Sequence, residues 1–144
     1  MIVVSTEAQE NADLVMKAVE VVFDNHDFTG LDHFFSEVFV QHSPYAPPGG
    51  LKELKAWLQR MVDAMPDVRG TIEQVIAARD RVVLFRTLRG TVVGDLPDFG
   101  ILAANQALEF QVAHMFQVAN GKITAHWEIM ESGPATRLAF QSMR

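Results

Sequence analysis

The chain has 144 residues, of which 49% are hydrophobic, and 12 basic against 18 acidic residues give it a net charge of −6. It contains no cysteine, which excludes disulfides, thiolate nucleophiles and cysteine-ligated metals, and its acidic balance argues against a nucleic-acid partner, which needs a basic surface. The length suits one domain over residues 1–144. Because it has neither a membrane-length apolar run nor a signal-like N-terminus, we expect a cytoplasmic protein without a membrane partner.

The first half of the sequence predicts helices. Apolar residues recur at spacings of three and four in two long segments, and a β-branched and aromatic stretch lies between them. The expected elements are helices over residues 6–25, 30–35 and 51–65 and a strand over residues 37–42. Thr6 followed by Gln9 fits a capping box at the start of the first helix, and Pro66 ends the last one.

The second half changes to the alternating pattern of strands. The expected elements are strands over residues 68–78, 81–93, 107–118 and 122–130 and a terminal helix over residues 134–143. Asn120-Gly121 predicts a hairpin turn, because both residues tolerate positive φ. Helices followed by a run of antiparallel strands indicate an α+β fold, in which helices cover one face of a curved sheet. Such a layer can enclose one apolar pocket.

Two of these strands carry polar side chains among apolar neighbours. His114 lies in the middle of ALEFQVAHMFQV, and His126 and Glu128 flank Trp127 in KITAHWEIM. A carboxylate inside a strand of a small domain costs free energy unless it is paired or neutral. Burial raises its pKa toward the range of a general acid or base at neutral pH. The two histidines and Glu128 are therefore the first candidates for a catalytic site.

The register of the hairpin decides whether these side chains meet. If Asn120-Gly121 is a two-residue loop, His114 pairs with Trp127, and Glu128 lies on the other face. A three-residue loop with a bulge at its last residue instead pairs His114 with His126 and puts both histidines and Glu128 on one face. The sequence allows both turns. We favour the three-residue loop because it gathers the polar groups.

Motifs for other chemistries do not occur in the sequence. It has no glycine-rich nucleotide loop, no HExxH zinc motif and no GxSxG elbow of a serine hydrolase. Two histidines and a carboxylate can form a metal site, but the spacing of His114, His126 and Glu128 is unspecific, and we expect no metal. Epoxide hydrolysis would need a carboxylate beside Arg86 or Arg89, and no aspartate pairs with either by spacing.

Two motifs match a known family. The stretch from His114 to Glu128 reads H-x-F-x-V-x-N-G-K-I-x-x-H-W-E, and residues 41–44 read QHSP. With the helix between them and the DLPDFG loop, they resemble the SnoaL-like polyketide cyclases of the NTF2-like superfamily, from about Ala8 to Glu131. The family has asparagine where Ser43 stands. The resemblance implies an α+β cone, in which helices wrap a strongly bent antiparallel sheet around a deep apolar pocket.

The resemblance also implies the chemistry. In these cofactor-free cyclases, an acidic residue after the HW pair removes a proton α to a carbonyl, and the enolate attacks a second carbonyl to close a ring. That residue is Glu128 here, in place of the usual aspartate. His114 matches a pocket histidine suited to hydrogen-bonding the enolate oxygen, and this match favours the hairpin that places it on one face with Glu128. His42 matches a position at the pocket mouth.

The sequence thus favours an enzyme, an aldol-type cyclase acting on a hydrophobic, carbonyl-bearing small molecule such as a polyketide. Glu128 and His114 are the expected catalytic residues. The expected substrate-binding side chains are those of His42, His126, Trp57, Tyr45, Phe85, Phe110, Phe116, Met115 and Met130. We expect a homodimer or higher homo-oligomer through the open sheet face. Two alternatives stay open: a non-catalytic binder of an apolar metabolite, and an NTF2-like isomerase or epoxide hydrolase.

Overall fold

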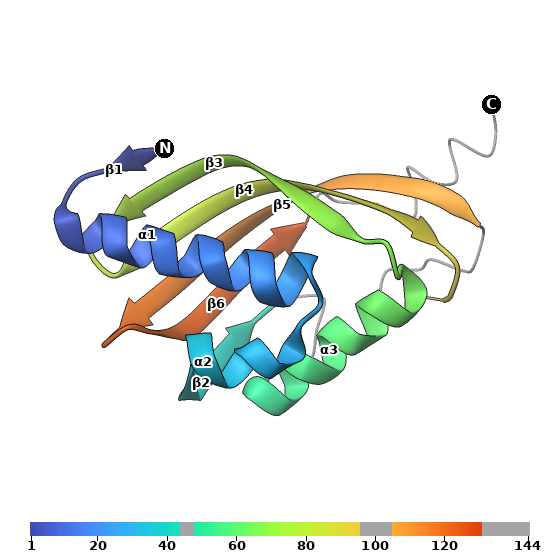
Figure 1. Cartoon of the computed structure of the whole chain (residues 1–144), viewed down its shortest axis with the longest axis horizontal. Coiled ribbons are helices and arrows are strands. Elements are labelled where there is room, and N and C mark those ends of the chain that lie inside the picture. Colours follow the sequence, from blue (N-terminus) through green and yellow to red (C-terminus); the bar gives the residue numbers. More distant parts are fainter. Residues whose placement is uncertain (44–47, 96–104, 131–144) are drawn as a thin grey trace.

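The structure is a computed structural model that describes residues 1–43, 48–95 and 105–130. Its helices lie together on one side of a six-stranded sheet (Figure 1). The strands are β1 (Ile2–Val3), β2 (Phe35–His42), β3 (Arg69–Ala78), β4 (Arg81–Val92), β5 (Gln106–Ala119) and β6 (Lys122–Met130). The helical elements are α1 (Thr6–Ala18), a π-helical segment (Val19–Asp24), a 3₁₀ turn (Phe28–Gly30), α2 (Leu31–Phe34) and α3 (Leu51–Ala64).

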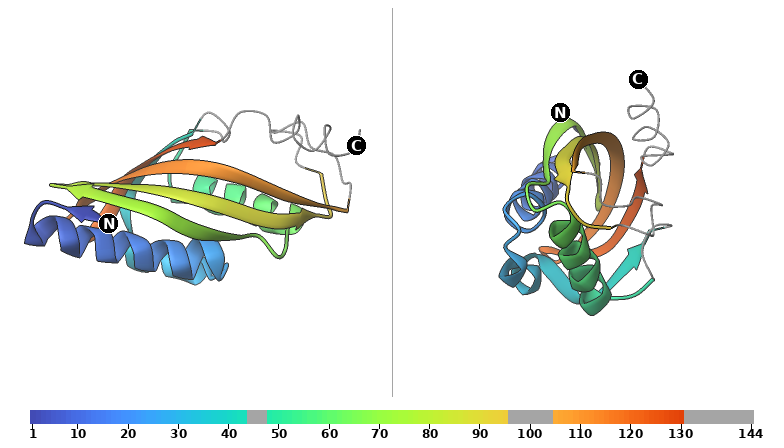
Figure 2. Two further views of the ribbon diagram at one scale, coloured as in Figure 1. Left: turned by 90° about the horizontal axis from the view of Figure 1, so that it is seen from above. Right: turned by 90° about the vertical axis from the view of Figure 1, so that its right-hand side faces the viewer.

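The sheet has the order β1-β3-β4-β5-β6-β2, and it curls around the helices without closing (Figure 2). The four strands from β3 to β6 are antiparallel, as the sequence predicts. The two edge strands differ, because β1 runs parallel to β3 and β2 runs parallel to β6. The α+β prediction is confirmed, and the expected purely antiparallel sheet is corrected to a mixed one. The two-residue strand β1 is too short to produce a periodic signal in the sequence.

The first helix buries the predicted apolar stripe. Its buried side chains, including those of the π-helical turn, are Ala8, Ala12, Val15, Ala18, Val19 and Val22. The predicted capping box is wrong, because Ser5 is the N-cap and its Oγ accepts a hydrogen bond from the amide of Ala8 at 3.1 Å. The Gln9 side chain instead donates to Asp13, one turn further on.

The end of the first helix widens into a π-helical turn. The amide of Asn25 donates to the carbonyl of Glu20, five residues back, at 2.9 Å. Such turns occur frequently at functional sites, because the additional residue changes the direction of the side chains that follow. Here the turn carries Phe23, which lines the internal cavity, and Asp24, which reaches a buried arginine.

The helix α3 packs a stripe of side chains against the sheet. The buried positions are Leu54, Trp57, Met61 and Ala64. The buried apolar residues form two clusters, one beneath α1 and one around α3. A cavity lined by residues of both clusters lies between them.

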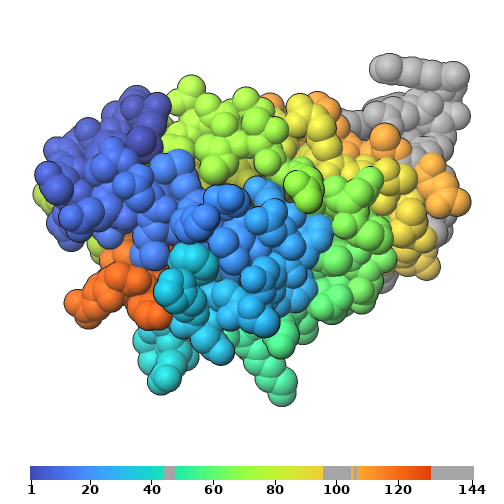
Figure 3. Space-filling model, in the orientation of Figure 1, coloured from blue at the N-terminus to red at the C-terminus, as the bar shows by residue number. Residues whose placement is uncertain are grey.

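From the helical side, α1, α2 and α3 together form one continuous layer of atoms over the sheet (Figure 3). Within the described ranges, no helix is both long and apolar enough to cross a membrane. The expected terminal helix over residues 134–143 and most of the DLPDFG loop lie outside the described residues.

Candidate active site

The hairpin between β5 and β6 places three polar side chains on the inner face of the sheet. Its turn is the two-residue loop Asn120-Gly121, with φ of 53° and 73°. The pairing shifts by one residue between Gln117 and Val118, and this bulge makes His114 face Glu128 across the strands. The three-residue loop that we favoured from sequence is therefore wrong. The bulge lies inside β6 instead of at the turn. Because one added residue reverses the face to which the following side chains point, His114, His126 and Glu128 still share one face, as expected.

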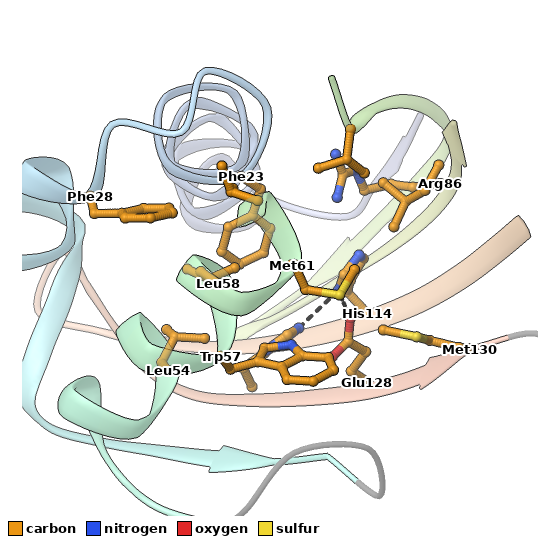
Figure 4. Close-up of a pocket in the computed structure, with 14 residues that line it drawn as sticks. Phe23, Phe28, Leu54, Trp57, Leu58, Met61, Arg86, His114, Glu128 and Met130 are labelled. Carbon is orange, nitrogen blue, oxygen red and sulfur yellow. Dashed lines mark hydrogen bonds and ion pairs between the residues drawn. The ribbon is translucent and has the colours of Figure 1, made fainter. Parts of the chain in front are cut away.

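The inner face and the helices line a partly open cavity of about 50 Å³ (Figure 4). Its polar end is formed by Arg86, His114, His126 and Glu128, all at most 7% exposed. The remaining wall is apolar and consists of Phe23, Phe28, Leu54, Trp57, Leu58, Met61, Val62, Val68, Leu88 and Met130. The side chains of β4, β5 and β6 thus supply the charged and hydrogen-bonding groups, and the helices supply most of the apolar surface.

Burial shifts the ionisation of the groups at the polar end. It raises the pKa of Glu128 from 4.5 to about 7, against the opposing influence of the Arg86 charge and a hydrogen bond from Ser43. It lowers the pKa of His126 to about 3 and that of His114 well below its ordinary value, and the nearby Arg86 charge lowers both further. Both histidines are therefore neutral at pH 7, whereas Glu128 titrates near neutral pH.

The two histidines form a hydrogen-bonded chain that ends at a glutamine. The Nδ1 atom of His114 lies 2.9 Å from Nε2 of His126, and Nδ1 of His126 lies 2.9 Å from Oε1 of Gln41 on β2. Glu128 Oε1 lies 3.9 Å from Nδ1 of His114, but this contact is not an ion pair at neutral pH because the imidazole is uncharged. Among the described residues, no group of three or more His, Asp or Glu side chains is placed to hold a metal ion.

A buried cation lies beside this chain. Arg86 on β4 is 2% exposed, and its Nη2 donates to Asp24 Oδ1, which also accepts a hydrogen bond from the amide of Gly70 at 3.0 Å. Burial lowers the pKa of Arg86, and Asp24 and Glu128 oppose that change. A Cβ at Gly70 would collide with the guanidinium of Arg86, so a side chain at this position would force the guanidinium to shift.

The structure brings together five of the eleven predicted site residues. Those that line the cavity are Glu128, His114, His126, Trp57 and Met130. Phe110 and Phe116 are buried in the core without lining the cavity, although Phe116 stacks on His126 with ring centroids 4.5 Å apart. Tyr45 lies outside the described residues.

The other three predicted site residues lie on the outer face of the sheet. Phe85 is 46% exposed, and Met115 pairs with Trp127 across the strands there. His42 is exposed and stacks on Trp127, with ring centroids 4.8 Å apart. Phe85 and Met115 were expected in the pocket because of residue type, and His42 because of the family resemblance, but the alternation of the strands turns all three away from it.

Sequence reasoning missed the roles of Gln41, Arg86 and Asp24 in this site. Gln41 and Phe39 are buried while Val40 and His42 are exposed, so the alternation along β2 would have selected Gln41 over its neighbour. No local signal links Asp24 to Arg86, because the two residues are 62 positions apart. Their meeting depends on how α1 packs across the sheet.

The match with known families agrees with this architecture. The family model of the SnoaL-like polyketide cyclases matches residues 13–137. The chain belongs to the SnoaL-like polyketide cyclase family. Comparison with curated proteins gives no match.

Solved structures share the NTF2-like fold at low sequence identity. AclR from Streptomyces galilaeus, a candidate hydroxylase, has a TM-score of 0.79 at 21% identity, with 92% of this chain and 86% of AclR covered. IdmH from Streptomyces antibioticus, a candidate polyketide cyclase, has a TM-score of 0.78 at 20% identity, with 90% and 98% covered. A SnoaL-like polyketide cyclase from Agrobacterium tumefaciens has a TM-score of 0.76 at 16% identity, with 90% and 97% covered. At these identities the likeness establishes the fold that this SnoaL-like chain adopts.

Proposed function

We propose that this SnoaL-like protein is a cofactor-free enzyme that removes a proton α to a carbonyl and closes a ring in a hydrophobic, polyketide-like substrate. The observation that supports this most directly is a carboxyl group, that of Glu128, buried on the wall of an apolar cavity with a pKa near 7. A general base works best when its pKa lies near the operating pH. A surface carboxylate would be a much weaker base.

The proposed reaction needs only groups at the polar end of the cavity. The carboxylate of Glu128 takes the α proton, and the electrons of the broken C–H bond form the enolate. The enolate carbon then attacks a second carbonyl of the same molecule, a C–C bond forms, and the resulting alkoxide takes the proton back from Glu128. Arg86 supplies a buried positive charge near Glu128, where it can stabilise the enolate oxygen.

The size of the cavity constrains how a substrate enters. A volume of about 50 Å³ holds several water molecules but is smaller than the roughly 150 Å³ cavity that accepts benzene. A ring-forming substrate therefore requires side chains of the wall to move. Met61 and Met130 are suited to this, because methionine is flexible and adapts to different shapes.

Deuterium exchange into hydrophobic ketones tests this function without knowledge of the natural substrate. Wild-type protein in D2O should catalyse exchange at the α carbon of ketones that fit the cavity, with a rate that rises between pH 6 and 8 as Glu128 ionises. Glu128→Gln should lose about 100-fold or more of this activity, whereas Glu37→Gln, on the exposed side of β2, should retain it. Equal exchange by wild type and Glu128→Gln would refute the role of Glu128. Ketone binding without any exchange would favour a non-catalytic binder.

Epoxide hydrolysis is a second candidate, and the pairing of Arg86 with Asp24 favours it. This pair supplies the carboxylate and arginine group that sequence spacing did not reveal, and Glu128 lies within electrostatic range of Arg86. In such a reaction a carboxylate takes a proton from water, the water oxygen bonds to an epoxide carbon while the ring C–O bond at that carbon breaks, and the alkoxide formed takes the proton back. Incorporation of ¹⁸O from labelled water into a diol product would distinguish this reaction from ring closure.

We also propose that the outer face of the sheet joins two copies of the chain. Apolar side chains form adjacent rows across the strands there, with Phe85, Ala113 and Ile129 in one row and Ile76, Val83, Met115 and Trp127 in the next. Phe85 is 46% and Ile129 is 67% exposed. A contiguous apolar surface of this kind is typical of a protein interface, and a second copy offers the same apolar surface in return.

A further inference from the structure

We propose that Gln41 fixes the tautomer of His126 and through it that of His114, so that His114 presents its bare Nε2 atom as a hydrogen-bond acceptor for a ligand hydroxyl. The tautomer follows from contacts within the protein and is independent of the proposed reaction. The choice of ligand rests on the proposed function, because it assumes that the cavity is the substrate site. Gln41 acts here as a positioning residue.

The chain of hydrogen bonds determines where the protons lie. A neutral imidazole has one N–H donor and one bare acceptor nitrogen, whereas an amide oxygen only accepts. Because Gln41 Oε1 lies 2.9 Å from His126 Nδ1, that nitrogen carries the proton and Nε2 of the same ring is bare. The bare Nε2 can only accept the hydrogen bond from His114, so His114 carries its proton on Nδ1. The remaining nitrogen of the chain, His114 Nε2, is then a bare acceptor.

The charges around the two histidines favour the same placement of their protons. Glu128 Oε1 lies 3.9 Å from Nδ1 of His114, and a carboxylate favours an N–H on the side of the ring that it faces. Arg86 lies close enough to disfavour positive charge on both rings. The two groups and the ring of His114 converge at one end of the cavity (Figure 4). If these hydrogen bonds ran in the opposite direction, a bare Nδ1 of His114 would face Glu128. The Nε2 of His114 would then carry a proton and add an N–H donor beside the Arg86 guanidinium.

Three buried side-chain atoms have no hydrogen-bond partner among the described residues, Nε2 of Gln41 being one of them. The other two belong to residues that line the cavity, and they define what a ligand must offer. Nε2 of His114 and Nε of Arg86 are buried and have no hydrogen-bond partner among the described residues, although buried polar atoms are normally paired. One is an acceptor and the other is a donor. A ligand that carries both a hydroxyl and a carbonyl oxygen, such as an enol or a hydroxylated aromatic ketone, would satisfy both. His114 then accepts a hydrogen bond and does not donate one to an enolate oxygen, in contrast to the role implied by family resemblance.

Nitrogen NMR of ¹⁵N-histidine-labelled protein tests the tautomer directly at pH 7. We expect protonated Nδ1 and bare Nε2 signals for both His114 and His126. A protonated Nε2 on His114 would overturn the proposal. This result requires no turnover, so it is independent of whether Glu128 acts as a base.

Variants of Gln41 test its control over the pair. Gln41→Glu keeps an oxygen acceptor and should leave both rings in the Nδ1–H form. Gln41→Met removes the acceptor and should produce a second set of His114 and His126 signals with Nε2 protonated. Gln74→Met, on the exposed side of β3, is the matched control and should leave the spectrum unchanged. Identical His114 signals in wild type and a folded Gln41→Met variant would refute the role of Gln41.

Phenol and anisole test the acceptor site, because only phenol carries a hydroxyl donor. Titration with phenol should shift the Nε2 signal of His114, and anisole at the same concentration should leave it in place. Equal shifts with both compounds would overturn the hydroxyl site, while the tautomer result stands separately.

Discussion

Replacing Glu128 with glutamine should make the stability of the protein less dependent on pH. The pKa of about 7 in the folded protein lies above the ordinary value of 4.5, so the folded state holds a proton that the unfolded chain releases. The stability contributed by this group is therefore complete below pH 4.5, decreases as the pH rises, and is lost above pH 7. Glutamine remains neutral throughout and does not show this loss.

The size of the effect follows from the two pKa values. At about 1.4 kcal/mol per pH unit, the gap between 4.5 and about 7 corresponds to roughly 3 kcal/mol in the free energy of unfolding. Most of this change, about 2.5 kcal/mol, falls between pH 5 and pH 8. Relative to wild type, Glu128→Gln should gain that amount of stability between these two pH values.

Urea unfolding followed by tryptophan fluorescence measures the difference. Wild type and Glu128→Gln are compared at pH 5 and at pH 8, and the titration of the buried histidines affects both proteins in a similar way. Glu37→Gln, which changes an exposed carboxyl on β2, controls for the loss of a negative charge. If the difference between wild type and Glu128→Gln changed by less than about 1 kcal/mol, the inference that burial raises this pKa would be refuted.

Three further outcomes follow from the fold. Ser5→Ala should lower the free energy of unfolding by about 1 kcal/mol while Thr6→Ala should not, and equal losses in urea denaturation would contradict the assignment of the N-cap. Gly70→Ala should cost about 3 kcal/mol, because its Cβ displaces the buried Arg86 guanidinium from its ion pair; an unchanged urea midpoint would count against this. Ile129→Lys should halve the mass measured by light scattering without loss of thermal stability, and a monomeric wild type would exclude the proposed dimer.

Several elements could be predicted because their signals are local. The strand β6 begins and ends where the sequence indicates, since a turn with two residues at positive φ precedes it. The buried stripe of α1 follows from spacings of three and four alone. The side chains of His114, His126 and Glu128 stood out because polar groups rarely occur inside such apolar strands.

Other features could not be predicted because they depend on distant or subtle contacts. The bulge in β6 adds one residue to the pairing, and nothing in the residues around Thr124 distinguishes it from a regular strand. The ion pair between Asp24 and Arg86 joins a helix end to a strand 62 positions away. On β2, Gln41 faces inward and the expected His42 faces outward. The two positions differ by one step in the alternation of the strand, and the match of His42 to a family motif favoured the wrong one.

The absence of cysteine already excluded thiol chemistry, and the acidic charge argued against a nucleic-acid partner. The alternating strands already indicated a carboxyl group placed between apolar neighbours. The sequence therefore determined which residue types meet, because periodicity and polarity are properties of short segments. Only the tertiary structure decided that Glu128 meets a neutral His114 and a buried Arg86. Burial and pairing depend on the curl of the sheet and the packing of α1 and α3, which bring together residues from every part of the chain.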